Sequence, residues 1–136
     1  MTMVHSVVER TRALLGTRFR PQGRDARFGL DCVGLVLTAY RLPPASVRRD
    51  YALRGTARAE IEAAIHPWFR RVPSSWSREG DLMLVQAAAD VLHLGIRSSD
   101  GMVHADARFG VVERPGVLPW PVLAIYRLRP RHLNRG

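Results

Sequence analysis

Hydrophobic positions recur with helical spacing in the first half of the chain. Residues 4–15 carry one apolar stripe and end at Gly16, a residue type that commonly terminates helices. The positions after Cys32 repeat this spacing as far as Pro43, where a proline interrupts the helix. Residues 57–68 carry a third stripe of the same kind. The pattern therefore predicts three helices, with residues 17–31 as a loop between the first two.

From residue 80 the hydrophobic period changes to that of strands. Short apolar or alternating runs, separated by turn residues, occupy 80–85, 91–97, 102–106, 111–114 and 122–128. Helices followed by a series of strands are typical of an α+β domain with an antiparallel sheet. The length of 136 residues suits one domain. We therefore predict a single domain over residues 1–136, with an arginine-rich tail from about residue 129.

The dipeptide Asp100-Gly101 is a strong signal for a tight hairpin turn. A two-residue turn at this position would place His93 opposite Arg108. The alternation of strand side chains still allows His93 and His104 to share one face of the sheet. This register therefore favours proximity of the two histidines but does not pair them directly.

The charge of the chain is strongly basic. The formal net charge is +9, and all 21 basic residues other than histidine are arginines. Such a charge favours polyanionic partners such as nucleic acid, anionic lipid or an anionic cell wall. Nucleic acid is not expected as the main partner, because the chain lacks zinc-finger spacing, a ribonucleoprotein-type aromatic motif and a clear helix-turn-helix. No apolar run is long enough to predict a membrane span.

Cys32 is the only cysteine, and it stands at the predicted start of a helix. Asp31 before it is a residue type that caps helix N-termini. Free N–H groups and the helix dipole favour an anion in the first turn, so the position predicts a lowered pKa for the Cys32 thiol and a nucleophilic role. The alternative is a structural thiol packed in the core, which is a common place for a single cysteine.

A cysteine nucleophile needs a base and a group that orients the base. His93 and His104 in the predicted sheet are the candidates for these two roles, although a histidine in a strand is often a structural, half-buried residue. The alternative hypothesis is a metal site, with Cys32, His93, His104 and Asp106 as its ligands. The chain lacks the paired ligand spacings of such sites, so we expect no metal and no cofactor.

Four short motifs together resemble the NlpC-type peptidases, which are papain-like cysteine peptidases of bacterial cell walls. The motifs are Leu30-Asp-Cys-Val-Gly-Leu-Val36, Gly80-Asp-Leu-Met-Leu84, His93-Leu-Gly-Ile96 and Val103-His-Ala105. Their order and spacing agree with the family over about residues 5–128. The short length and the start at Leu14-Leu-Gly-Thr17 are most similar to phage-tail and gene-transfer-agent members of the family.

The resemblance implies a fold and a role for each site residue. The fold would pack the Cys32 helix on an antiparallel sheet that carries both histidines. Cys32 would be the nucleophile, His93 the general base and acid, and His104 the group that orients His93. Asp31 would help to bind a free amine of the substrate. The implied substrate is the peptide stem of peptidoglycan, often cut between D-γ-glutamate and the diamino acid.

Two positions depart from the pattern of the family. Val33 replaces a serine, which removes a hydroxyl that could contact substrate. Phe19 replaces an upstream tyrosine that polarises the scissile carbonyl, and phenylalanine cannot donate a hydrogen bond. By analogy with papain-type sites, Gln22 and the backbone N–H of Cys32 would then be the donors to an oxyanion. These departures put substrate preference and catalytic rate in question more than the fold.

Two other functions remain open on the sequence. The first is a catalytically weak tail-tip, assembly or wall-binding protein on the same fold. The second is a cysteine amidase or acyltransferase with another substrate. The N-terminus shows no recognisable secretory signal. We therefore expect a protein that is cytoplasmic at synthesis and that a phage-like tail particle could carry to the periplasm or cell wall.

Overall fold

The computed structural model describes residues 3–43, 55 and 57–130, with side chains from residue 6 onward. Its helices are α1 (Met3–Ala13), α2 (Cys32–Ala39) and α3 (Arg58–Ile65), with a short 3-10 helix at Ser74–Trp76. The three predicted helices are thus present. Each ends two to four residues before its predicted C-terminal boundary. The end of the predicted arginine-rich tail, from residue 131, lies outside the described residues.

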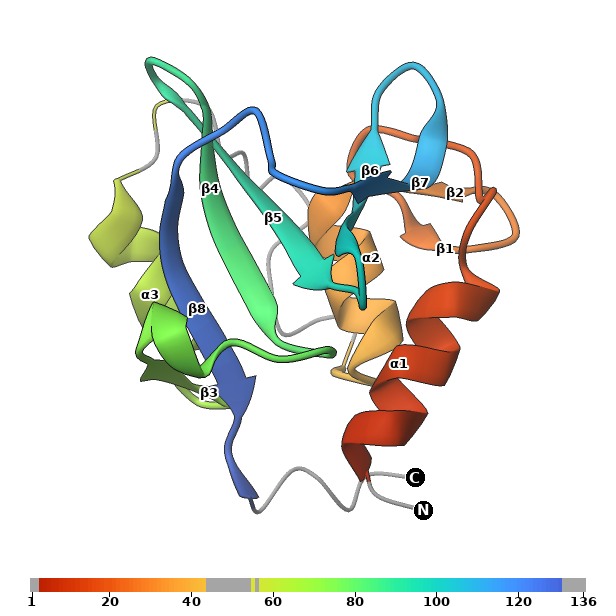
Figure 1. Cartoon of the computed structure of the whole chain (residues 1–136). Helices are drawn as coiled ribbons and strands as arrows, with labels where there is room; N and C mark the ends of the chain where they lie inside the picture. The colour runs from red at the N-terminus through yellow and green to blue at the C-terminus, as the bar shows by residue number, and fades with distance from the viewer. Residues whose placement is uncertain (1–2, 44–54, 56, 131–136) are drawn as a thin grey trace.

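A six-stranded antiparallel sheet forms the second half of the domain, in the order β3-β8-β4-β5-β6-β7. Its strands are β3 (Phe69–Val72), β4 (Leu82–Ala88), β5 (Val91–Arg97), β6 (Gly101–Asp106), β7 (Gly110–Pro115) and β8 (Val122–Leu128). A two-stranded sheet of β1 (Arg24–Asp25) and β2 (Gly29–Leu30) lies beside α2 (Figure 1). The predicted α+β fold, with the Cys32 helix packed on an antiparallel sheet, is confirmed.

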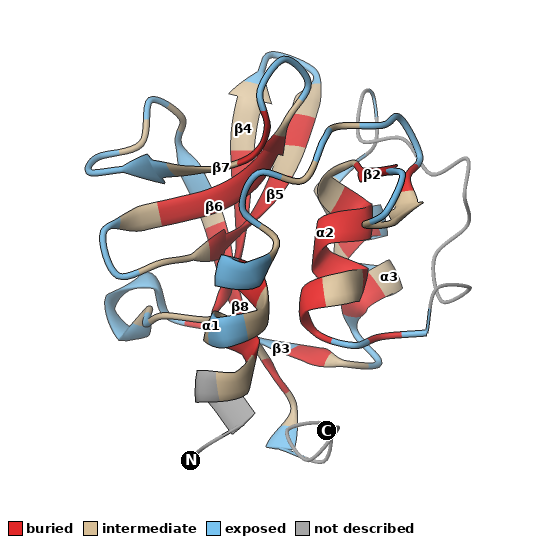
Figure 2. Ribbon diagram, turned by 90° about the vertical axis from the view of Figure 1, so that its right-hand side faces the viewer, coloured by how far each residue is buried: buried red, intermediate tan, exposed pale blue. Residues whose placement is uncertain are grey.

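The core lies between α2 and the sheet. Most residues of α2 are buried, and they pack with buried residues of β4, β5, β6 and β8 (Figure 2). Helix α1 packs against α2, where the Arg10 side chain donates a hydrogen bond to the backbone oxygen of Ala39 at 2.8 Å. Burial of the apolar face of α2 stabilises it, because a helix of eight residues is too short to be stable alone in water. The core thereby places the first residue of α2 against the sheet.

Three short strands were missed by the sequence pattern. Strands β1 and β2 have two residues each and lie within the predicted loop 17–31. Strand β3 has four residues, with two exposed arginines between a buried Phe69 and a buried Val72. Such segments are too short to show the alternation of a half-buried strand. They become strands because neighbouring strands supply their hydrogen-bond partners.

The predicted turn between β5 and β6, and with it the predicted strand register, is wrong. The two turn residues are Ser99 and Asp100, one position earlier in the chain than the predicted Asp100-Gly101. The structure pairs Arg97 with Met102, and the backbone N–H of Ser98 donates to the oxygen of Gly101 at 2.9 Å. Gly101 therefore lies in β6 and not in the turn. A Cβ atom at Gly101 would collide with the backbone oxygen of Arg114 on β7, so this strand position requires glycine. Beyond the turn β5 and β6 diverge, and α2 lies against both strands (Figure 1).

A buried ion pair joins the segment before β4 to the end of β8. Arg127 donates from Nε to Oδ1 of Asp81 and from Nη2 to Oδ2, both at 2.9 Å. The backbone N–H of Arg78 also donates to Asp81 Oδ2, at 3.0 Å. The side chains of Asp81 and Arg127 are only 3% and 11% exposed. Asp81, which belongs to one of the four sequence motifs, therefore has a structural role away from the cysteine.

Candidate active site

A cavity of about 630 Å³ brings together residues that lie far apart in the sequence. Helix α2, strands β5 and β6, the loop before β1 and the loop before β8 all contribute to its wall. The lining includes all six site residues predicted from the sequence: Phe19, Gln22, Asp31, Cys32, His93 and His104. The other lining residues that bear on the site are Val33, Asp106, Ala107 and Trp120. The cavity is therefore the candidate active site.

Cys32 is the first residue of α2, as predicted. The carboxylate of Asp31 caps the helix by accepting a hydrogen bond from the backbone N–H of Gly34 at 2.8 Å. Gly34 fits here because a Cβ atom at this position would collide with the backbone oxygen of Gly23. The loop before β1 can therefore lie directly against the first turn of α2. The close approach sets the wall of the cavity beside Cys32.

The Asp31 carboxylate is already engaged within the protein. Besides capping α2, Oδ1 accepts a hydrogen bond from Nη1 of Arg24 at 2.8 Å, and Oδ2 accepts one from the backbone N–H of Gln22 at 3.0 Å. The Arg24 and Asp31 side chains are only 6% and 15% exposed. These internal hydrogen bonds offset part of the charge that an amine ligand would use. The role of Asp31 in amine binding, which the resemblance implies, stays a prediction.

The predicted lowering of the Cys32 pKa is wrong. Burial raises the pKa of the thiol to about 12, and the neighbouring Asp31 charge acts in the same direction. Hydrogen bonding by the backbone of Leu94 and of Val33, and the charge of Arg24, lower the pKa by less. A helix N-terminus typically contributes about 0.3–1 kcal/mol, which is smaller than the cost of ionising a buried group. The sequence showed the helix position but not the burial.

His93 and His104 contact each other directly. Nε2 of His93 lies 3.0 Å from Nδ1 of His104, and the two rings are perpendicular. Because Nε2 of His93 is engaged with His104, Nδ1 is the ring nitrogen that remains to accept a proton from another group. If His93 donates in this contact, His104 accepts at Nδ1 and carries its own proton on Nε2. The contact then fixes the orientation of the His93 ring, as the predicted roles require.

Both histidines are neutral at neutral pH. Burial lowers the pKa of His93 to about 4, and the neighbouring His104 lowers it further, whereas Asp106 acts to raise it. Burial also lowers the pKa of His104, with Arg114 acting in the same direction. With a protonated thiol at Cys32, the free site therefore holds a neutral thiol beside a neutral imidazole. Such a pair can act by transferring the proton during attack on a carbonyl carbon.

Trp120 and Asp106 are site residues for which the sequence interpretation assigned no role in catalysis. The Trp120 ring packs edge-on against His93 and His104, with ring centres 5.9 and 5.2 Å apart. Nε2 of His104 is buried and has no hydrogen-bond partner among the described residues. A single tryptophan between two prolines carries no pattern from which this contact could have been predicted.

The pH dependence of thiol alkylation tests the raised pKa of Cys32. We expect the rate with iodoacetamide to rise about tenfold for each pH unit from pH 7 to pH 10, because only the thiolate reacts. The His93→Ala variant should show the same slope, since a neutral imidazole provides no positive charge to stabilise a thiolate. A plateau near pH 7 that disappears in His93→Ala would instead reveal a preformed ion pair.

Residues 3–43, 55 and 57–130 contain no group of three or more histidine, cysteine, aspartate or glutamate side chains arranged to hold a metal ion. Within the same residues, no helix has the length and hydropathy needed to cross a membrane.

Solved structures with a similar fold include two from peptidoglycan hydrolases. The NlpC/p60 domain of the hydrolase SagA matches with a TM-score of 0.55 and 20% identity, covering 80% of this chain and 86% of that chain. The hydrolase RipB from Mycobacterium tuberculosis matches with a TM-score of 0.60 and 19% identity. That match covers 92% of this chain but 64% of RipB, so the chain spans less than two thirds of RipB. No protein-family model and no curated protein sequence matches the chain. The structure therefore has the papain-like α+β fold of NlpC/p60 domains.

Proposed function

We propose that the protein is a cysteine peptidase that hydrolyses amide bonds in the peptide stems of bacterial peptidoglycan. The observation that carries the proposal is the 3.0 Å contact between His93 and His104 in a cavity that Cys32 also lines. This set supplies a nucleophile, a base and a group that orients the base. The fold shared with two peptidoglycan hydrolases supports the choice of substrate.

In the proposed reaction, the sulfur of Cys32 attacks the carbonyl carbon while Nδ1 of His93 takes the thiol proton. Collapse of the tetrahedral intermediate breaks the C–N bond, and His93 gives the proton to the leaving amine. Water then hydrolyses the thioester, which releases a carboxylate and restores the thiol. Because Cys32 and His93 are both neutral in the free site, proton transfer accompanies the attack and does not precede it.

The developing oxyanion needs hydrogen-bond donors near Cys32. The backbone N–H of Cys32 and the side-chain amide of Gln22 are the proposed donors. Gln22 lines the cavity and has a positive φ of 58°, a backbone conformation that few residues other than glycine adopt. Its backbone N–H donates to Asp31, which holds this part of the loop beside α2. Phe19 also lines the cavity, but its side chain cannot donate.

The Arg24–Asp31 ion pair bears on which stems are cut. With the carboxylate occupied, the site does not favour a substrate that presents a free amine at this position. The proposed substrate is therefore a stem whose first amino group is acylated, as it is when the peptide is still attached to the glycan strand. We also propose, from the sequence resemblance alone, that a phage-tail or gene-transfer-agent particle delivers the protein to the wall.

Digestion of purified peptidoglycan tests this function. We expect the wild-type protein to release new amino ends without new reducing sugar ends, since a peptidase cuts amide bonds and leaves glycosidic bonds intact. Mass spectrometry of the soluble products then identifies the bond that is cut. Reducing ends without amino ends would contradict the proposal, and acylated products would indicate an acyltransferase.

Two features of the site favour a second candidate function. The high pKa of Cys32 and the phenylalanine at position 19 both lower the reactivity expected of the site. A wall-binding protein that retains the fold but little activity would fit these two features. Such a protein should sediment with insoluble peptidoglycan and release no amino ends during prolonged digestion.

A further inference from the structure

The pentapeptide Asp-Ala-Arg-Phe-Gly occurs twice in the chain, at residues 25–29 and 106–110. Both copies form the same turn, in which the aspartate stands opposite the glycine of an antiparallel pair. In each copy the backbone N–H of the arginine donates to Oδ1 of the aspartate, at 2.9 Å in the first and 2.8 Å in the second. Both glycines have a positive φ, of 129° and 80°. The turn therefore requires the aspartate and the glycine, but not the arginine or the phenylalanine.

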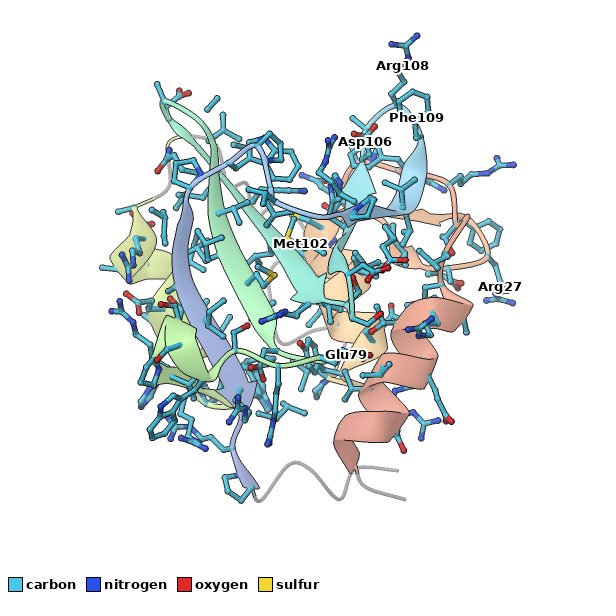
Figure 3. The ribbon with its side chains drawn as sticks, viewed as in Figure 1. Arg27, Glu79, Met102, Asp106, Arg108 and Phe109 are labelled. Carbon is cyan, nitrogen blue, oxygen red and sulfur yellow. The ribbon has the colours of Figure 1, made fainter. Side chains whose placement is uncertain are left out.

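The arginine and phenylalanine of each copy project into solvent. Phe28 is 57% exposed and Phe109 is 67% exposed. The guanidinium carbon of Arg27 lies 5.4 Å from the ring centre of Phe28, and that of Arg108 lies 5.3 Å from the ring centre of Phe109. Figure 3 shows Arg108 and Phe109 extending away from the end of the sheet, and Arg27 extending outward from the turn between β1 and β2. Neither phenylalanine contributes appreciably to the core. The exposed Arg-Phe pairs at the two turns are therefore candidates for a role at the surface.

Both turns pack against the same segment of chain, residues 17–20. A Cβ atom at Gly110 would collide with the backbone oxygen of Thr17. A Cβ atom at Gly29 would lie 2.7 Å from Cβ of Arg20, which is closer than packed carbon atoms approach. The two turns are therefore held on one part of the molecule, although they lie far apart in the sequence.

This part of the molecule borders the candidate active site. Phe19 of the intervening segment lines the cavity, and so do Asp106 and Ala107 of the second copy. The arginines on either side of Phe19 are exposed. We name these exposed residues the Arg–Phe rim, which comprises Arg18, Arg20, Arg27, Phe28, Arg108 and Phe109.

We propose that the Arg–Phe rim binds an anionic wall polymer, a glycan strand that bears peptide carboxylates, beside the cavity that receives the stem. This inference rests on the proposed function and extends it from the scissile bond to the polymer that carries it. Guanidinium groups bind carboxylates through two parallel hydrogen bonds, and aromatic rings pack against the apolar faces of sugars. The net charge of +9 complements such a polyanion.

The internal contacts of the rim are compatible with this ligand. Arg27 pairs with Asp25 at 2.8 Å, but the two side chains are 80% and 46% exposed. An exposed ion pair of this kind is typically worth only about 0–1 kcal/mol, so a ligand carboxylate can replace Asp25. Each phenylalanine ring also lies beside the guanidinium of its own arginine. This polar stack suits a hydrated polymer better than the apolar interior of a membrane.

Sedimentation with insoluble peptidoglycan tests the inference, with every protein in a Cys32→Ala background so that binding is measured without cleavage. The rim variant carries Arg27→Ala, Phe28→Ala, Arg108→Ala and Phe109→Ala, and it retains the aspartates and glycines of both turns. The matched control carries Arg70→Ala, Arg71→Ala and Trp76→Ala, which removes the same charge and an exposed aromatic residue near β3. We expect the rim variant to bind roughly tenfold more weakly, which corresponds to about 1.4 kcal/mol, and the control to bind nearly as wild type.

Cleavage of a short soluble stem peptide whose first amino group is acylated separates the two proposals. With Cys32 restored, the rim variant should cleave this peptide at the wild-type rate, because the peptide does not reach the rim. Equal wall binding by the rim variant and its parent would overturn the inference, as would an equal loss in the matched control. Rim-dependent binding to vesicles of anionic phospholipid, with no binding to peptidoglycan, would also overturn it. Failure of the proposed function would appear separately, as the absence of new amino ends from the wild-type protein.

Discussion

Replacement of Cys32 by alanine is expected to lower the rate of amino-end release from peptidoglycan by about 10⁴-fold or more, because no other described group can form the thioester. Cys32 lines the cavity and is partly buried at the edge of the core, so the small change to alanine should leave the fold intact. The measurement is the initial rate of amino-end release, with circular dichroism and sedimentation with peptidoglycan as checks on the fold. A Cys32→Ala protein that digests the wall at the wild-type rate would show that another residue is the nucleophile.

A pair of histidine variants supplies the control for this experiment. His93→Ala should lower the rate by roughly 10²–10⁴-fold, which is the usual contribution of a general acid and base. His66→Ala should leave the rate unchanged, because His66 is exposed at the end of α3 and does not line the cavity. Equal losses in both variants would point to a general effect on stability and not to proton transfer at His93.

The second large effect is expected on stability. Asp81→Ala should lower the free energy of unfolding by about 3–5 kcal/mol, because it leaves the Arg127 guanidinium poorly exposed and without its carboxylate partner. It also removes the acceptor for the backbone N–H of Arg78. Urea unfolding monitored by tryptophan fluorescence measures the change. The loss should exceed that of most surface substitutions several-fold.

A double-mutant cycle identifies the cause of this loss. If the ion pair is responsible, Asp81→Ala combined with Arg127→Ala should cost clearly less than the sum of the single variants, since the double variant buries no unpaired charge. Arg27→Ala is the matched control, because it breaks an Asp–Arg pair of similar geometry at an exposed site, where we expect a loss below about 1 kcal/mol. Additive losses at Asp81 and Arg127 would indicate that the two residues act independently.

The raised pKa of Cys32 changes the interpretation of the site. A thiol at the start of a helix is expected to ionise easily, yet burial and Asp31 together outweigh the helix terminus. Arg24 lowers the pKa of the thiol, but it is also paired with Asp31. In the proposed mechanism, proton transfer therefore accompanies the attack. Negative charge on the substrate develops only during the reaction, when the oxyanion forms.

Local sequence patterns determined the elements and the chemistry of the candidate site. The periodicity around Cys32 predicted α2, and the strand patterns predicted five of the six strands in the larger sheet. The order of one cysteine and two histidines indicated the residues that the cavity brings together. These inferences succeed because helix and strand periods, caps and nucleophile chemistry depend on neighbouring residues. The repeated pentapeptide is equally visible in the sequence, but its two copies acquire a shared location only through residues 17–20.

Long-range contacts decided the features that periodicity does not encode. The β5–β6 turn lies one residue earlier than predicted, and Gly101 instead pairs with Pro115 of β7. Asp31 is paired with Arg24, which reaches it from a separate strand. The sequence by itself therefore determined the fold class and the reactive residue types. Only the tertiary structure decided the register, the charge states and the access to the site, since each depends on which groups the folded chain buries together.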